Sequence, residues 1–259
     1  MLNLNTIMKP LVNCLLFVCL IGSINTYGQT QDSITFNATI GLTNNGISNV
    51  PNFSLNKPAI TTYFSFSKGR LSFDPQIHVS TEFKPWQNSY WFHYKLLDQN
   101  KFKLKAGVGL NFSYEYSNVI ANEIRKSLIT GNSYFMSELS IDYIINKYLI
   151  ISPFYLNGQG REKSGAGYLR FFSLATTIQN INVGNNLKAA VIPQIYHVLL
   201  DGLNGDFFST SLAIQSSQTP FSISAMMNTP IGHANTLPAS FVWSGSVLFN
   251  FGKTFYYKK

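Results

Sequence analysis

Apolar and polar residues alternate strictly along the segment 101–117. The apolar positions are Phe102, Leu104, Ala106, Val108, Leu110, Phe112, Tyr114 and Tyr116, with Lys, Gly, Asn, Ser or Glu between them. Because successive strand residues point to opposite faces, the pattern predicts one β-strand with an apolar and a polar face. It is at least twice as long as the usual strand of about 5 to 6 residues. A tilted strand of about 9 to 11 residues crosses a membrane's hydrocarbon layer, so this length favours a membrane-spanning strand.

Similar alternation along the rest of the chain predicts about twelve strands. We expect them at about 33–42, 58–67, 70–81, 89–96, 101–116, 133–145, 148–156, 167–179, 187–198, 207–215, 220–228 and 240–257. The connections alternate between long ones, such as 117–132 and 199–206, and short ones. Long external loops, short periplasmic turns and an even strand number are typical of bacterial outer-membrane barrels. We therefore predict an all-β fold, a closed antiparallel up-and-down transmembrane β-barrel with the polar face inside.

Two regions fit this pattern less well. Around 148–198, apolar residues such as Phe154 and Phe171 fall on both faces of the predicted strands. Either an inward loop packs against that sector, or the strand boundaries there are wrong. In the long connection, the segment 118–129 has the apolar spacing of one or two helical turns, which would cap the mouth or fold inward.

The amino end reads as a secretory signal peptide. Lys9 is the only charge before an apolar stretch at 11–21, and Thr26 and Gly28 suit the −3 and −1 positions of a cleavage site. The stretch is shorter than the roughly 18 residues that a helical membrane span needs. We expect residues 1–28 to be removed and 29–259 to form one barrel domain. Both cysteines, Cys14 and Cys19, would leave with the signal, which excludes a disulfide scaffold or a thiol enzyme.

Composition supports the barrel interpretation. The chain is 45% hydrophobic and 15% aromatic with only 12% charged residues, whereas soluble domains carry about 25% charged residues. No later apolar run reaches the length of a membrane helix. A barrel explains how an apolar composition can occur without long apolar runs, because it places apolar residues at every second position. The formal net charge is +8, but no nucleic-acid recognition motif accompanies it, so we expect no nucleic-acid partner.

At its carboxyl end the chain resembles Gram-negative outer-membrane β-barrel proteins. The segment from Asn250 through Gly252 and Phe255 to Tyr257 looks like the last-strand signal that the barrel-assembly machinery reads. The resemblance extends over everything after the signal peptide. It implies localisation in the cell outer membrane, contact with outer-membrane lipids, and the barrel-assembly machinery as a partner during biogenesis.

Basic residues gather near the short, periplasmic turns. Lys101, Lys103 and Lys105 share the polar face of one strand, and the tight turn before them brings Lys95 alongside. Such a lumen basic cluster needs water or carboxylates between its ammonium groups. The expected partners on the same wall are three carboxylates, Asp142, Glu138 and Glu115. The expected strand register places Asp142 opposite Lys105. We predict an anion-attracting periplasmic vestibule that accepts small anionic solutes; the alternative is that basic residues meet lipid phosphates.

Catalytic and metal chemistry find little support in the sequence. His78 and Ser80 share a strand face, and a His-x-Ser pair resembles the outer-membrane phospholipase A type of barrel. Parity places both inside with Asp74, away from acyl chains, so ordinary lumen polarity is the better interpretation. No His, Cys, Asp or Glu spacing indicates a metal site, and we expect no cofactor.

Three functions follow in order of preference. The first is a narrow porin-like channel for small, anionic solutes, which is not an enzyme. The second is a closed structural barrel that displays external loops for envelope or surface interactions. The third is an outer-membrane lipid-modifying enzyme. Twelve strands lie between the roughly eight whose side chains fill a lumen and the 16 to 18 of open porins. Inward residues such as Trp91, Tyr63, Tyr134 and Met136 would narrow the pore.

Overall fold

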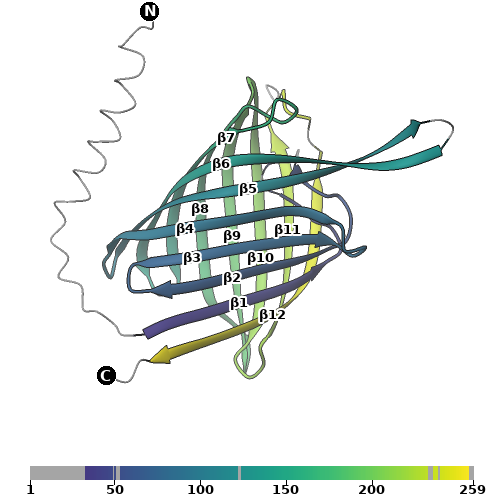
Figure 1. The fold of residues 1–259 in the computed structure, drawn as a ribbon. Helices are drawn as coiled ribbons and strands as arrows, with labels where there is room; N and C mark the ends of the chain where they lie inside the picture. The colour runs from purple at the N-terminus through teal and green to yellow at the C-terminus, as the bar shows by residue number, and fades with distance from the viewer. Residues whose placement is uncertain are drawn as a thin grey trace, which may run out of the picture. The chain divides into compact units, whose positions relative to one another are not determined.

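The computed structural model describes residues 33–48, 50, 53–121, 124–232, 236–238 and 240–256, and these form twelve β-strands (Figure 1). The predicted signal peptide at 1–28 and Tyr257 lie outside the described residues. The strands are β1 (Ser33–Thr43), β2 (Ala59–Lys68), β3 (Leu71–Ser80), β4 (Pro85–Asp98), β5 (Phe102–Ala121), β6 (Ile124–Asn146), β7 (Leu149–Gly160), β8 (Tyr168–Gly184), β9 (Leu187–Leu200), β10 (Leu203–Ser216), β11 (Phe221–Ile231) and β12 (Val242–Tyr256). The described residues contain no helix that is long and apolar enough to span a membrane.

Each strand pairs antiparallel with the next, and the first strand pairs with the last. The register between β1 and β12 runs from Ser33 opposite Tyr256 to Thr43 opposite Ser246, which closes the sheet into a barrel. Closure leaves no free sheet edge around the wall, so backbone amides and carbonyls are satisfied between strands, as a lipid environment requires. The predicted closed twelve-stranded barrel is confirmed.

The two faces of the wall differ as the alternation predicts. On β5, Val108 and Leu110 are 48% and 37% exposed on the outside, whereas Asn111 and Ser113 are buried inside. Many large apolar side chains, including Phe251 on β12, share the exposed outer face. A soluble monomer rarely exposes so much contiguous apolar surface, but acyl chains cover it in a membrane. The molecule is therefore an outer-membrane β-barrel.

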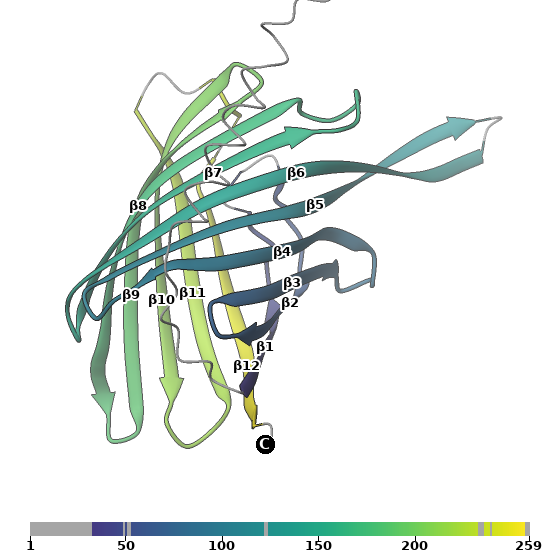
Figure 2. The same ribbon diagram turned by 60° about the vertical axis from the view of Figure 1, so that its left-hand side comes forward.

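The connection predicted at 117–132 is wrong, because it is mostly strand. β5 and β6 continue as a two-stranded ribbon until Ala121 lies opposite Ile124, and the hairpin extends past the neighbouring strands (Figures 1 and 2). β4 pairs with β5 only as far as Ser113. The predicted helical turns at 118–129 are wrong for the same reason: cross-strand hydrogen bonds satisfy this backbone.

The connection predicted at 199–206 is also wrong, because β9 and β10 meet in a two-residue turn. Asp201 and Gly202 both have positive φ angles, of 50° and 84°. A two-residue turn with both φ values positive matches the twist of the flanking strands, and Asp-Gly is a preferred pair for it. The Asp201-Gly202 pair is the sequence signal that indicates this turn, and the alternation of apolar residues does not contain it.

An apolar cluster fills part of the lumen beside β8, β9 and β10. Phe171, Tyr196 and Phe207 stack across these strands with ring centroids 5.0 Å apart at each step. Val50 from the β1–β2 connection and Leu237 from the β11–β12 connection are buried in the same cluster. Of the two explanations for the sector with apolar residues on both faces, inward packing is therefore correct, because connecting segments fold in and bury the lumen-facing side chains.

Candidate functional site

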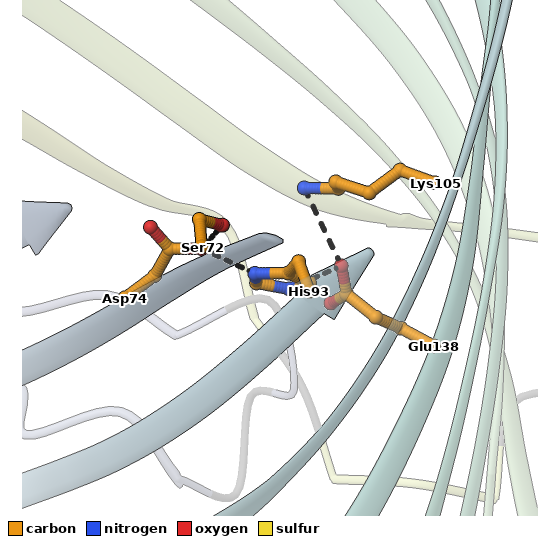
Figure 3. A network of polar contacts seen from close by, with 5 residues as sticks. All are labelled: Ser72, Asp74, His93, Lys105 and Glu138. Carbon is orange, nitrogen blue, oxygen red and sulfur yellow. Dashed lines mark hydrogen bonds and ion pairs between the residues drawn. The ribbon is translucent and has the colours of Figure 1, made fainter. Parts of the chain in front are cut away.

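A network of polar side chains runs along the inner face of the barrel wall, from β3 to β6 (Figure 3). The imidazole of His93 on β4 contacts Oδ2 of Asp74 through Nδ1, and its Nε2 lies 2.9 Å from Oε1 of Glu138 on β6. The first contact is a hydrogen bond, and the second is within the distance of an ion pair that forms when the imidazole is protonated. Ser72 donates to Asp74 at 2.6 Å, and Nζ of Lys105 lies 3.6 Å from Glu138. Lys105, together with His93 when its imidazole is protonated, balances the charge of two partly buried carboxylates, which is the condition for keeping them inside.

Gly107 makes this network possible. His93, Gly107 and Glu138 lie side by side on β4, β5 and β6 in the strand register. A Cβ at position 107 would overlap Cδ2 of His93 and lie 2.9 Å from Cγ of Glu138. Because glycine has no side chain, the imidazole reaches over β5 and joins two strands that are not direct neighbours. Trp91 stacks on His93 with ring centroids 5.6 Å apart and fixes the ring orientation.

The predicted basic cluster is partly neutralised by carboxylates, but not by the predicted pair. Asp98 lies 3.7 Å from Nζ of Lys95 and 3.9 Å from Nζ of Lys103. Lys105 lies opposite Ser140 in the register, so the expected pairing of Lys105 with Asp142 is wrong. The error follows from the length of the two strands: β5 and β6 stay paired until Ala121 lies opposite Ile124, so the register is not set by a long loop.

Of the three predicted acidic partners, Glu138 lies beside Lys105, and the other two have different surroundings. Asp142 lies opposite Lys103 in the register and accepts a hydrogen bond of 2.6 Å from Ser152. Glu115 lies opposite Thr130 on the projecting hairpin, beyond the last pairing of β5 with β4. Ten residues of β5 separate Glu115 from Lys105, so Glu115 is too far along the strand to be a partner of the lysines. Lys101, on the short β4–β5 connection, completes the lysine group at the end of the barrel that carries the short turns.

His78 and Ser80 lie inside the barrel, each only 7% exposed. The imidazole of His78 packs between the rings of Tyr63 and Trp86, with centroid distances of 4.9 and 5.6 Å. The Ser80 hydroxyl accepts a hydrogen bond from the amide of Lys84 at 3.2 Å. Both side chains have structural contacts and face away from the lipid, so they cannot present a nucleophile and a base to an acyl chain.

A cavity of about 580 Å³ lies in the lumen, lined by β1–β8 on one side and by β10–β12 on the other. We call it the lumen cavity. Its first wall carries large side chains such as Tyr63, Trp86 and Trp91, and the opposite wall carries small ones such as Ser211 and Ser244. The small side chains leave the space that the apolar cluster fills elsewhere, so the lumen is narrowed without being solid.

The β1–β2 connection bounds this cavity from within the barrel. Nε1 of Trp86 on β4 donates a hydrogen bond of 2.7 Å to the carbonyl of Phe53, and the Phe53 ring lies 5.6 Å from that of Tyr134 on β6. Gly46 lies against Trp86, where a Cβ would be 2.9 Å from the indole. The connection is therefore held in the lumen by defined contacts.

A further groove, of about 650 Å³, lies mostly on the outer face over β6–β10. Apolar side chains such as Leu139, Pro153 and Leu174 line it, together with a hydrogen-bonded pair in which Nδ1 of His197 lies 2.7 Å from Oδ1 of Asp206. Lipid covers this face of a membrane barrel, so we do not place the solute path there. Among the described residues, no group of three or more His, Cys, Asp or Glu side chains has the arrangement of a metal site.

The residues of the predicted assembly signal lie on β12. Asn250 points inward and accepts a hydrogen bond of 3.0 Å from Thr39, whereas Phe255 is 50% exposed on the outer face. Gly252 lies against Asn37 of β1, where a Cβ would be 2.7 Å from Oδ1. These positions form the seam that closes the barrel. Recognition of the segment by the assembly machinery stays a prediction.

Comparisons with known proteins find likeness of structure only. No family model and no curated protein sequence matches the chain. LpxR from Salmonella typhimurium is 9% identical with a TM-score of 0.49, over 84% of this chain and 99% of that one. A KdgM porin in complex with disordered oligogalacturonate is 6% identical with a TM-score of 0.47, over 86% and 99%. An outer membrane channel from Pseudomonas putida F1 is 10% identical with a TM-score of 0.46, over 88% and 98%. Our fold assignment rests on the strand pairing of this chain itself.

Proposed function

We propose that this protein is a narrow porin-like channel for small solutes in the outer membrane. The lumen cavity of about 580 Å³ carries the proposal, because a barrel with a purely structural role has no need of a hollow, polar interior. Twelve strands enclose more space than side chains alone fill, yet less than the open aqueous channel of a 16-stranded porin. A path beside β10–β12 is the part of the lumen that remains for solutes.

The narrowing of the lumen is consistent with selection by size. Aromatic side chains fill the sector beside β8–β10, and the β1–β2 connection lies across the remaining space. At the periplasmic end, Lys95, Lys101, Lys103 and Lys105 provide the local excess of positive charge that attracts anions. Asp98 and Glu138 reduce that excess through the ion pairs of three of these lysines. We infer a modest preference for anions rather than a strong one.

Single-channel recording in planar bilayers tests the proposal. The purified barrel should give small, discrete conductance steps. Trp86→Phe removes the hydrogen bond that holds the Phe53 carbonyl, so the β1–β2 connection should loosen and the conductance should rise or become noisier. Trp243→Phe, at a position 57% exposed on the outer face, is the matched control and should conduct like the parent protein. Folded barrels that never conduct, with or without Trp86→Phe, would contradict the proposal.

A closed barrel that displays external segments is the second candidate function. The projecting β5–β6 hairpin favours it, because Leu128 and Ile129 are more than half exposed beyond the last pairing of β6 with β7. A silent bilayer recording together with loss of cell-surface binding on shortening the hairpin would support this alternative. Lipid modification is the least supported function, and we propose that the barrel is not an enzyme; lipase activity that is lost with His78→Ala would contradict this.

A further inference from the structure

We propose that the lumen cavity is a binding site for an uncharged, hydroxyl-rich solute, of which a monosaccharide or disaccharide is the simplest example. The inference deepens the proposed function, on which it rests in treating the cavity as part of the solute path. Its volume of about 580 Å³ lies within the range of about 300 to 1,000 Å³ typical of small-molecule sites.

Charge is scarce in the lining. Among its described residues, Glu138 is the only Asp, Glu, Lys or Arg. That carboxylate is already engaged by Lys105 at 3.6 Å and by His93 at 2.9 Å. A charged solute would leave water without gaining a counter-charge here, which is costly in a confined space. The cavity therefore favours neutral solutes, whatever the lysines attract to the periplasmic entrance.

Polar groups in the lining nevertheless require partners. Asn111 is only 5% exposed, and its buried side-chain amide oxygen has no hydrogen-bond partner among the described residues. Nδ1 of His78 likewise has no well-aligned partner. Side-chain amides of Gln76 and Gln87 and several serine hydroxyls surround the same space. Hydroxyl groups both donate and accept, so a polyhydroxylated ligand satisfies such a mixed set better than a hydrocarbon does.

Aromatic faces supply the second half of the recognition. Tyr63, 43% exposed, offers its ring to the open lumen, and Trp86 and Trp91 line the same wall with 5% and 7% of their surface exposed. An aromatic face is electron-rich and attracts the weakly positive C–H groups of a sugar ring. A wall of rings beside amides and hydroxyls thus contacts the apolar face and the polar rim of one saccharide at once. A flat lipid tail would use only the first of these contacts.

The two cavity tryptophans provide a direct readout, because the chain has three tryptophans and the third, Trp243, faces outward. Intrinsic fluorescence of the full barrel in detergent is titrated with glucose and with maltose, and separately with gluconate as an anion of similar size. We expect a saturable change with a saccharide and at least about fivefold weaker binding of gluconate. The change should persist in Trp243→Phe.

Asn111→Leu keeps the side-chain size and removes the amide, so saccharide affinity should fall at least about fivefold. Asn157→Leu is the matched control: Asn157 follows the lumen-facing Leu156 on β7 and so points outward, and its variant should bind normally. Circular dichroism confirms that both variants are folded. Absence of any saccharide effect, equal binding of gluconate, or equal affinity of both variants would overturn the inference. Saccharide binding by a barrel that never conducts would contradict the channel function but not the saccharide site. Conduction without saccharide binding would contradict the saccharide site but not the channel function.

Discussion

Single glycines decide which side chains meet across the lumen wall. Gly107 lies between His93 and Glu138 in the register, and Gly109 lies under Trp91, where a Cβ would be 2.8 Å from the indole. At both positions, a large side chain of β4 occupies the space over the glycine of the neighbouring strand β5. Alternating large and missing side chains pack a curved wall without voids, and this arrangement also holds the buried imidazole in place.

We predict that Gly107→Ala destabilises the barrel by about 1 to 3 kcal/mol, because the added methyl group overpacks the wall and displaces His93 from Glu138. Urea unfolding in lipid vesicles, followed by tryptophan fluorescence, measures the change. Gly131→Ala is the matched control, since its Cβ would be in ordinary contact, 3.6 Å from the Tyr114 ring. Equal stability of the two variants would show that the network does not depend on the glycine.

At the scale of the elements, the outer ends of the strands are tied down by local contacts. The β7–β8 connection is fixed by Glu162, which accepts hydrogen bonds of 2.5 Å from the amide and 2.6 Å from the hydroxyl of Ser133 on β6. At its other end, the amide of Gly167 donates to the carboxylate of Asp201 in the β9–β10 turn at 2.8 Å. One short connection thereby links β6, β7 and β8 to the turn between β9 and β10.

These hydrogen bonds predict a pH-dependent connection. They hold the pKa of Glu162 below its ordinary value of 4.5. Because the folded-state pKa is the lower one, the stabilising contribution is complete above pH 4.5 and is lost as the pH falls through the depressed value. Hydrogen exchange at the Ser133 amide should accelerate, beyond its intrinsic change, over that range.

Glu162→Gln should mimic the acid state at neutral pH and expose Arg161 and Lys163 to faster cleavage by trypsin. Glu82→Gln, in the β3–β4 connection where Glu82 pairs with Lys84, is the control and should leave cleavage at 161–163 unchanged. A connection that is equally resistant in the parent and in Glu162→Gln would show that this carboxylate does not hold it.

At the scale of the whole molecule, charge is distributed along the barrel axis. Lysines gather at the periplasmic end of the lumen, where Lys95 and Lys105 lie directly opposite each other in the register. Like charges in that position repel, and Asp98 and Glu138 lie close enough to offset the repulsion. The remaining excess of positive charge acts at the scale of the whole barrel, because the electrostatic field at an entrance sums the charges of all its strands.

We predict that changing Lys95, Lys101 and Lys103 together to Glu shifts the channel toward cations. The reversal potential in a salt gradient across a planar bilayer measures this preference, and the shift should shrink at high ionic strength. Lys253→Glu is the control, because Lys253 lies near the same end but faces outward, with its ammonium 5.3 Å from the Phe255 ring. An unchanged reversal potential in the triple variant would show that these lysines do not face the ion path.

The sequence alone determined the barrel, because strand alternation is a local property that each segment carries in its own residues. The inward positions of Asp74 and His78 followed from the same parity. Only the tertiary structure decided what those inward groups contact. The bridge from Asp74 through His93 to Glu138 depends on the register of four strands, and that register depends on where the hairpin turns fall. The inward β1–β2 connection and the lumen cavity likewise depend on packing between residues far apart in the chain, which no periodicity encodes.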